Sequence, residues 1–545
     1  MKAMIPGHDE RGHSKMNRKI IDMETEEKVV RLAKPVKKGL LRLLFSRFFV
    51  IAVLLIAQVA LMFTVYFWFR EQLPYFLYIQ WAFAFVMIVY LFNCNMDSSA
   101  KLTWMLIISL VPPLGTALLL WTQANIGHRK TTELAKDQIE KTRNMLEQPA
   151  DIIGQVERDG SGIDDLSKYL SRSGCFPLYG GTKVTYFELG EKKFEAMLEQ
   201  LEKAEKFIFM EYFIVEEGYM WGRILDLLIR KAKEGVEVRV MYDGMCEMST
   251  LPADYWKLLE AQGIHAKAFS PIIPVVSSHY NYRDHRKILV IDGKVAFNGG
   301  VNLADEYINA RERFGHWKDT AVMLEGDAVR SFTMMFLQMW NLNKDDPDYE
   351  TWLSAPCDVP EDASGYVLPY SDCPLDEYKA GEAVYMDVLY RATEYVHIMT
   401  PYLILDGELL NALTFAAQRG VDVKIILPGI PDKKVAYSLA KTHYKALNAA
   451  GVKIYEYTPG FVHAKVFVSD DIRAIVGTIN LDYRSLYHHF ECATYMYKTD
   501  CVPEIEKDFQ NTLAACRKVT AESIKNEKFS YKAIGSLAKM ISPLM

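Results

Sequence analysis

An internal repeat limits the fold of this chain more than any other feature of the sequence. Residues 206–244 read KFIFMEYFIVEEGYMWGRILDLLIRKAKEGVEVRVMYDG, and residues 394–429 read EYVHIMTPYLILDGELLNALTFAAQRGVDVKIILPG. Each copy has a short apolar strand, an acidic turn with glycine, an amphipathic helix and a Gly-Val-Xaa-Val start of a second strand. Such strand–helix–strand units pair their strands in parallel and cover the sheet with helices. The sequence therefore predicts an α/β fold made of two α/β/α halves related by a pseudo-two-fold axis.

The region before the repeat is much more apolar. Residues 48–69 carry no charge, and one helix needs about 20 such residues to cross a bilayer. Residues 75–92 and 102–120 are also uncharged, and the last segment is interrupted by Pro112-Pro113. We predict an α-helical membrane region over 48–122, in which the third segment is re-entrant or tilted because of the proline pair.

These features divide the chain into seven parts. The C-terminal part has apolar residues at helical spacing with lysines among them, which fits either an interfacial helix on an anionic leaflet or a helix packed on the soluble part. The predicted parts are a polar N-terminal tail at 1–47, the membrane region at 48–122, a linker helix at 123–174, the first half at 175–345, a linker at 346–370, the second half at 371–528 and an amphipathic C-terminal segment at 529–545.

Each half contains the same spaced set of polar residues. The first is HRKILVID, with His285, Lys287 and Asp292, and the second is HAKVFVSD, with His463, Lys465 and Asp470. The pattern His-x-Lys occurs at seven of the twelve histidines, but only these two have Asp five residues after the lysine. Because the two sets occupy equivalent places in the repeat, we predict that they form one catalytic site.

The local pattern around each set is that of a strand and a turn. The apolar alternation predicts strands in which each histidine and its lysine, two residues apart, point to the same face. Asp292-Gly293 is a hairpin signal, and Asp470-Asp471 stands at the equivalent place. We therefore expect both aspartates to hold turns and nearby backbone rather than to carry protons.

Further residues surround the two sets. GGVNLADEY and GTINLDYRS place Asn302 and Asn480 as neutral donors, and Gly300 lets the chain pass close to whatever the histidines hold. Glu491, in HHFECA, is expected either to fix the tautomer of a catalytic histidine or to be a structural carboxylate. The adjacent His488 and His489 are interpreted as packing or surface residues.

Two histidines, two lysines and two asparagines suit one anionic tetrahedral centre. A neutral imidazole can attack phosphorus, and a protonated one can donate to the departing alkoxide. The lysines and amides stabilise charge on the remaining oxygens. This chemistry needs no metal or other cofactor, and the sequence offers no carboxylate cluster to hold a metal. The predicted reaction is phosphodiester exchange through a phosphohistidine.

These motifs resemble the phospholipase D superfamily and, more narrowly, the bacterial cardiolipin synthases. The resemblance rests on NYRDHRKILVIDG, GGVNLADEYI, GTINLDYRSL, KLTWMLIISLVPPLG and the C-terminal ISPL, and it covers residues 40 to 545. It implies a duplicated phospholipase D-type domain, the first histidine as nucleophile, and transfer of a phosphatidyl group between two phosphatidylglycerol molecules with release of glycerol. Two positions depart from the family pattern: Asp284 stands where asparagine is common, and Cys246 where glycine is usual.

Other functions remain as alternatives. The same chemistry with water or serine as acceptor is open, since a covalent intermediate leaves the acceptor to the shape of the pocket. A nuclease would need a basic groove, and the net charge of −6 and the hydrophobic N-terminus argue against a nucleic-acid partner. Two intact motifs argue against a catalytically dead binding protein tethered to the membrane.

The charges predict a multi-pass protein of the cell membrane with its catalytic part on the cytosolic side. Arg42 and Arg47 precede the hydrophobic region and Arg129 and Lys130 follow it, and positive flanks stay in the cytosol. The eight cysteines show no C-x-x-C spacing, which is typical of free thiols in a reducing compartment.

Overall fold

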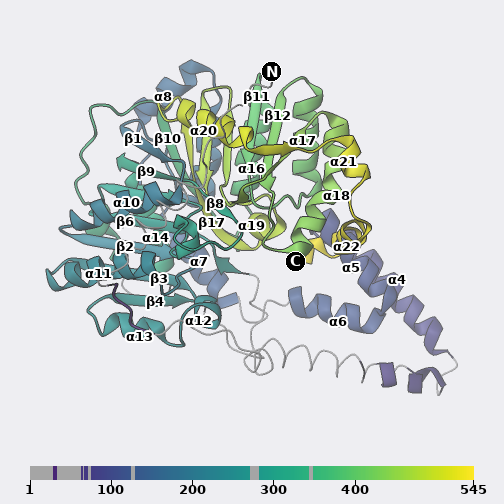
Figure 1. The fold of residues 1–545 in the computed structure, drawn as a ribbon. Helices are drawn as coiled ribbons and strands as arrows, with labels where there is room; N and C mark the ends of the chain where they lie inside the picture. The colour runs from purple at the N-terminus through teal and green to yellow at the C-terminus, as the bar shows by residue number, and fades with distance from the viewer. Residues whose placement is uncertain are drawn as a thin grey trace, which may run out of the picture.

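Two mixed β-sheets with covering helices form the body of the molecule, and three apolar helices extend from it (Figure 1). The computed structural model describes residues 29–33, 60, 63–65, 67–71, 75–123, 129–270, 282–342 and 348–544. Most of the predicted polar tail at 1–47 and most of the hydrophobic segment at 48–69 lie outside the described residues.

The first sheet has the strand order β1-β9-β7-β6-β2-β3-β4. Strands β2 and β3 are parallel, whereas β6, β7 and β9 continue the sheet in antiparallel fashion from β2. Its strands are β1 (Thr182–Phe187), β2 (Phe207–Tyr212), β3 (Glu237–Asp243), β4 (His265–Phe269), β6 (Lys287–Ile291), β7 (Val295–Gly299) and β9 (Ala321–Gly326).

The second sheet repeats this order as β10-β17-β16-β15-β11-β12-β13, with β18 added at its edge and the short β5 paired to β17. The predicted duplication of the α/β unit is therefore present strand by strand. The strands are β5 (Arg283–Asp284), β10 (Tyr366–Asp372), β11 (Tyr395–Met399), β12 (Asp422–Pro428), β13 (Lys453–Tyr457), β15 (Val466–Ser469), β16 (Arg473–Gly477), β17 (His489–Tyr497) and β18 (Cys516–Lys518). Strands β8 (His316–Lys318) and β14 (Gly460–Val462) pair separately, one from each half.

The helices of the two halves lie on the outer faces and between the sheets. In the repeat, α11 and α17 connect parallel strands, as the apolar pattern predicts. The helices of the body are α7 (Arg129–Thr142), α8 (Ala150–Asp159), α9 (Ile163–Gly174), α10 (Gly190–Glu202), α11 (Tyr219–Lys233), α12 (Cys246–Ser249), α13 (Tyr255–Glu260), η1 (Asp305–Ile308), α14 (Val329–Trp340), α15 (Tyr349–Leu353), α16 (Ala380–Arg391), α17 (Gly407–Gln418), α18 (Lys434–Ala450), α19 (Tyr483–Tyr487), α20 (Val502–Ala514), α21 (Ala521–Lys525), α22 (Phe529–Lys539) and η2 (Ser542–Leu544).

One hydrophobic core joins the two halves. Phe209 and Ile288 of the first sheet and Val396 and Phe467 of the second belong to one buried cluster, which also includes Phe336 of α14. Burial of this much apolar surface between the sheets is the main term that holds the halves together. The halves therefore share one core and keep a fixed relative position, as a site built from both of them requires.

Two segments differ from the predicted domain boundaries. The region 123–174 contains three helices, α7 to α9, in place of one linker helix, because Pro149 precedes α8 and Gly160 and Gly162 have positive φ values of 63° and 72°. Leu170 of α9 is fully buried in the main core. The linker at 346–370 ends inside the second sheet, because β10 begins at Tyr366.

The apolar N-terminal helices are α4 (Phe76–Asn93), α5 (Ser98–Leu110) and α6 (Pro112–Gln123). The segment 102–120 is divided at Val111, just before the proline pair, and α5 and α6 pack against α4 through Leu91, Ile108 and Leu119. A close approach at Gly115, where a Cβ would lie 2.9 Å from the Cα of Ile108, permits this hairpin. Among the described residues, none of the helices combines the length and the apolar character that crossing a membrane demands.

Candidate active site

The two motif histidines each lie between a short strand and a longer one. His285 comes after β5 and before β6, and His463 comes after β14 and before β15. The prediction that each histidine lies on the strand with its lysine is therefore wrong, because β6 begins two residues after His285, and β15 begins three residues after His463 and leaves Lys465 outside it. The N–H of His285 donates to the carbonyl of Phe490 at 2.9 Å, and the N–H of His463 donates to the carbonyl of Lys318 at 2.7 Å. Each histidine is thus attached to the opposite half.

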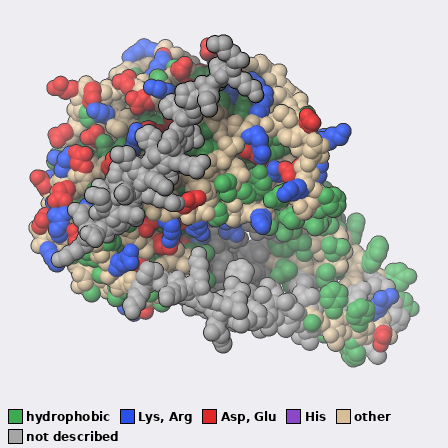
Figure 2. All heavy atoms as spheres, viewed as in Figure 1, with side chains coloured by type: hydrophobic (Ala, Val, Ile, Leu, Met, Phe, Trp, Pro, Cys, Tyr) green, Lys and Arg blue, Asp and Glu red, His purple; other side chains and the backbone are tan. Residues whose placement is uncertain are grey.

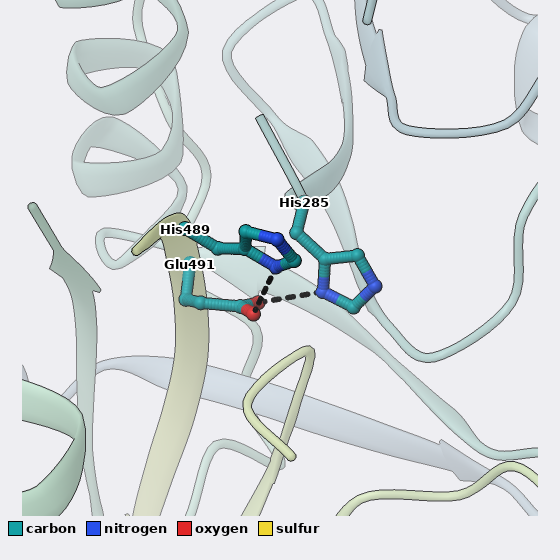
Figure 3. Close-up of side chains that lie close together, drawn as sticks. All are labelled: His285, His489 and Glu491. Carbon is teal, nitrogen blue, oxygen red and sulfur yellow. Dashed lines mark hydrogen bonds and ion pairs between the residues drawn. The ribbon is translucent and has the colours of Figure 1, made fainter. Parts of the chain in front are cut away.

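A carboxylate from the opposite half binds each imidazole. Nδ1 of His285 lies 2.9 Å from Oε2 of Glu491, and Nδ1 of His463 lies 2.7 Å from Oδ2 of Asp319 (Figure 3 for the first pair). A carboxylate at Nδ1 favours the tautomer that carries its proton there, which leaves the lone pair on Nε2 when the ring is neutral. The arrangement gives two oriented imidazoles, one from each half.

Sequence reasoning found Glu491 but missed Asp319. The two carboxylates occupy equivalent places, because Asp319 follows β8, which pairs with β14, and Glu491 lies on β17, which pairs with β5. A signal was present in the sequence: Asp319 and Glu491 are 172 positions apart, close to the 178 that separate the histidines. Glu491 also accepts a hydrogen bond from the hydroxyl of Thr478.

Burial and charge control the titration of the histidines. Burial lowers the pKa of His285 well below its ordinary value, and the neighbouring Glu491 opposes this effect. Burial and Lys465 lower the pKa of His463 to about 4, against the opposing charge of Asp319. Both carboxylates have lowered pKa values although burial alone would raise them, because each is paired with a histidine. Burial therefore favours the neutral form of both rings in the free protein, against the charge of their carboxylate partners.

The two motif lysines are buried beside the histidines. Nζ of Lys287 donates to the carbonyl of His285, and Nζ of Lys465 donates to the carbonyl of His463 and lies 3.0 Å from both ring nitrogens. Burial lowers the pKa of Lys287 to about 8 and that of Lys465 to about 7. Lys193, which the sequence did not single out, is a third buried lysine whose pKa burial lowers to about 7.

The electrostatic interactions connect the two sets into one site. The charge of Asp319, the partner of His463, acts on Lys287 as well as on Lys465. The charge of Glu491, the partner of His285, likewise acts on both lysines. The contacts across the halves, of His285 with Phe490 and Glu491 and of His463 with Lys318 and Asp319, place both sets at the interface between the halves.

The motif aspartates lie at the hairpin turns. The carboxylate of Asp292 accepts from the backbone N–H groups of Glu205, Lys206 and Phe207 at 2.7–2.8 Å. Asp470 accepts from the N–H groups of Thr393, Glu394 and Tyr395 at 2.8–3.0 Å. Both aspartates have positive φ values of 54–55° at the turn. Asp292 thus connects its turn to the start of β2, and Asp470 connects its turn to the start of β11. The carboxylate oxygens of both aspartates accept hydrogen bonds from backbone N–H groups.

The two predicted asparagines and Gly300 contact other residues of their own half. The amide nitrogen of Asn302 donates to the hydroxyl of Tyr307 at 2.9 Å, and that of Asn480 donates to the hydroxyl of Ser485 at 3.0 Å. An amide has two N–H groups, so each keeps one more donor. Gly300 makes room for a protein side chain, since a Cβ there would lie 2.1 Å from Oδ1 of Asp319.

Two clusters of the described residues have ligand atoms close enough to share a cation. One is His285, His489 and Glu491, and the other is Glu382, Asp406 and Glu408. In the second cluster a protein cation is already present, because Nζ of Lys379 lies 3.5 Å from Oε2 of Glu382. Of the two interpretations of His489, packing or surface, its burial excludes the surface one, and the residue lies beside His285 and Glu491 (Figure 3).

Comparison with known proteins gives consistent results. The family model described as "Cardiolipin synthase, PLD-like domain" matches residues 197–340 and 385–513, one match in each half. The chain is 32% identical over 466 residues to the cardiolipin synthase of Alkalihalophilus pseudofirmus, covering 85% of this chain and 92% of that protein. It is 58% identical over 458 residues to an uncharacterized protein of Streptococcus mutans, covering 84% of this chain and 99% of that protein.

A solved structure supports the fold independently of sequence. The phosphatidylserine synthase of Haemophilus influenzae superposes with a TM-score of 0.51 at 13% identity, covering 66% of this chain and 93% of that one. With the duplicated α/β halves and the two family matches, these findings lead to one assignment. The chain belongs to the phospholipase D superfamily, as a cardiolipin synthase-like member that carries the domain twice.

Proposed function

We propose that this protein is a cardiolipin synthase, which transfers a phosphatidyl group from one phosphatidylglycerol molecule to another. The observation that carries the proposal is the reciprocal pairing of His285 with Glu491 and of His463 with Asp319. Two oriented imidazoles beside two buried lysines suit an in-line exchange at a phosphodiester, in which one ring attacks and the other handles the proton. The similarity to curated cardiolipin synthases supports the choice of substrate.

In the first step, Nε2 of one histidine attacks the phosphorus of phosphatidylglycerol. A phosphorus–nitrogen bond forms, and the bond from phosphorus to the oxygen of the head-group glycerol breaks. The second histidine, as imidazolium, gives its proton to that oxygen, and glycerol leaves. Lys287, Lys465, Asn302 and Asn480 stabilise the charge on the remaining oxygens. We assign His285 as the nucleophile; a phosphatidyl adduct trapped on His463 would reverse this assignment.

In the second step, the terminal hydroxyl of another phosphatidylglycerol attacks the same phosphorus. Its proton passes to the histidine that protonated glycerol, the new phosphorus–oxygen bond forms, and the phosphorus–nitrogen bond breaks. Cardiolipin leaves, and the enzyme returns to its starting protonation state. This symmetry of roles fits a site whose two histidines have equivalent partners.

The low pKa values of the histidines connect protonation to substrate binding. In the free protein both rings are neutral at pH 7, because burial keeps the pKa of His463 at about 4 and that of His285 well below its ordinary value. A bound phosphodiester brings a negative charge, which raises the pKa of the nearest imidazole. The acid of the first step thus takes up its proton together with the substrate.

We also propose that the protein works at the cell membrane with its catalytic part on the cytosolic side. Exposed apolar side chains on α4 and α22 support membrane contact, including Trp81 at 78% and Leu537 at 67% exposure. Figure 2 shows hydrophobic side chains gathered on the side of the molecule where these helices lie. The positive flanks of the hydrophobic region and the eight cysteines, which form no disulfide, support the cytosolic side.

Turnover of purified full-length protein in phosphatidylglycerol vesicles tests this function. Cardiolipin and free glycerol should appear in equal amounts. His285→Ala and His463→Ala should each reduce the rate at least about 10³-fold, and the double variant should be little slower than either, because residues that act as a unit are not additive. Phosphatidic acid as the main product would identify a hydrolase, and phosphatidylserine formed on addition of serine would identify a different acceptor.

A further inference from the structure

A third histidine lies against the catalytic pair. His489 is the first residue of β17 and precedes Glu491 by two positions, so both side chains lie on the same face of the strand. Its ring centroid is 5.3 Å from that of His285, and its Nδ1 is 3.6 Å from Oε1 of Glu491. Figure 3 shows the three side chains turned toward one another. The reaction described above does not use His489.

The imidazole of His489 is buried without a matching hydrogen bond. Only 8% of the residue is exposed, and within the part of the chain that the structure describes neither ring nitrogen has a hydrogen-bond partner. A buried polar group that lacks a partner costs free energy, so native structures rarely keep one unless it has another use. Nδ1 of His489 lies within ion-pair distance of Oε1 of Glu491, the second dashed line in Figure 3, but 3.6 Å is too long for a hydrogen bond. The other oxygen of Glu491 is engaged by His285 and Thr478, and Nε2 of His489 has no hydrogen-bond partner among the described residues.

The equivalent place in the other half has the same property. Trp317 precedes Asp319 by two positions, is 5% exposed, and has its ring centroid 5.5 Å from that of His463. Its Nε1 likewise has no hydrogen-bond partner among the described residues. An indole nitrogen can only donate, whereas an imidazole can donate or accept. A ligand common to both positions must therefore offer acceptor atoms, and the non-bridging oxygens of a phosphodiester do so.

We propose that His489 is a substrate-binding residue that donates a hydrogen bond to a phosphate oxygen of the lipid on the His285 side. A phosphorus atom in position for attack lies about 3–3.5 Å from Nε2 of its nucleophile, so its oxygens come within reach of a ring centred 5.3 Å away. Lys287 and Lys465 hold the same anion by charge, and His489 adds a directed contact. This inference rests on the proposed function in taking a phosphodiester as the substrate.

The test compares His489→Phe with His489→Gln, which keeps an N–H donor. Inorganic phosphate is the probe, and its dissociation constant is measured by calorimetry with the full-length protein in micelles. His489→Phe should weaken phosphate binding about tenfold or more, as expected for a lost hydrogen bond to a charged group, and should lower kcat/KM for phosphatidylglycerol by a similar factor. His489→Gln should stay within about threefold of the unmodified protein in both measurements.

A matched control is His443→Phe on α18. His443 is also buried, at 3% exposure, and its Nδ1 also has no hydrogen-bond partner among the described residues, but it lies outside the site. This variant should bind phosphate normally. Phosphate binding by folded His489→Phe that equals that of the unmodified protein, or a loss as large in His489→Gln as in His489→Phe, would overturn the inference. Thermal melting verifies that each variant is folded.

The two proposals can fail separately. If the unmodified protein binds phosphate through His489 but makes no cardiolipin, the proposed function is wrong and the binding role stands. If cardiolipin forms and His489→Phe changes neither phosphate affinity nor kcat/KM, the binding role is wrong and the proposed function stands.

Discussion

Asp319 and Glu491 perform the same task in opposite halves but differ in their other contacts. Glu491 accepts a second hydrogen bond from the hydroxyl of Thr478, whereas Asp319 lies against Gly300, where no side chain fits. The two motif histidines are therefore similar in geometry and unequal in environment. This inequality gives a physical basis for one ring to act as nucleophile and the other as acid.

Replacing Asp319 by Asn should reduce catalysis without unfolding the protein. The amide cannot stabilise an imidazolium on His463 as a carboxylate does, so we expect kcat to fall at least about 10²-fold. Single-turnover transfer in vesicles measures this change. Asp292→Asn provides the contrast, because that carboxylate binds only backbone N–H groups: its melting temperature should fall while kcat per folded molecule stays within about threefold. Unchanged kcat in Asp319→Asn would contradict the role of the pair.

The lowered pKa values of the two motif lysines predict that activity falls at alkaline pH. A lysine is charged below its pKa and neutral above it, and burial lowers the pKa of Lys465 to about 7 and that of Lys287 to about 8. As pH rises through this range the free enzyme loses the charges that attract the phosphodiester, so kcat/KM should decline between about pH 7 and 8. Lys465→Arg, which stays charged, should move the decline upward. A kcat/KM that stays constant to pH 9.5 would show that other groups bind the anion.

The sequence was sufficient for some site residues and not for others. His285 and His463 could be found because their lysines and aspartates recur at fixed spacing in both halves. Asp319 and His489 were missed, because their meaning depends on β8 pairing with β14 and β17 with β5, contacts between residues more than 140 positions apart. The spacing of Asp319 and Glu491 becomes informative only once Glu491 is recognised as the partner of a catalytic histidine. The apolar periodicity of one strand does not indicate which strand of the other half pairs with it.

At the scale of elements, the C-terminal segment contacts both the body, through α22, and the N-terminal hairpin, through α5. Helix α22 packs on α18 at Gly535, where a Cβ would lie 2.3 Å from the carbonyl of Ser438. The hydroxyl of Thr103 on α5 donates to the carbonyl of Met540 at 2.9 Å, which connects the C-terminal segment to the hairpin. The sequence left two alternatives for 529–545, a helix packed on the body or an interfacial helix. The structure has features of both, because α22 packs on α18 and also exposes apolar side chains.

Leu537→Glu should weaken binding to vesicles that contain anionic lipid. The side chain is 67% exposed, and moving a leucine into a bilayer surface is worth about 1.5–3 kcal/mol, or roughly tenfold or more in partitioning. Co-sedimentation with phosphatidylglycerol vesicles measures the change. Val359→Glu is the matched control, since Val359 is 53% exposed on the connection between the halves. Equal binding of both variants would show that α22 does not face the lipid.

At the scale of the whole molecule, the duplication was readable from the sequence and the arrangement of the membrane region was not. The two copies of the strand–helix–strand unit predict two sheets, and the observed strand orders match one another. From the sequence, the hydrophobic segments show only their length and the proline interruption of the third. The fold of 102–120 into two helices depends on contacts of α5 and α6 with α4. Hydropathy alone cannot distinguish a packed hairpin from a kinked span.

The side of the membrane on which the catalytic part lies is the remaining question at this scale. The positive flanks predict the cytosol, whereas three crossings that start from a cytosolic N-terminus would place the catalytic part outside. The third segment is divided into two short helices, α5 and α6, which leaves two continuous hydrophobic segments and agrees with the positive flanks. The test uses chains in which the half-buried Cys94, Cys357, Cys373 and Cys516 are replaced by serine and one cysteine is introduced at Glu199, on the outer face of α10. A membrane-impermeant thiol reagent should label this cysteine in lysed cells and leave it unlabelled in intact cells. Equal labelling before and after lysis would place the catalytic part outside, and the charge pattern would then have been overridden by the folding of the hydrophobic region.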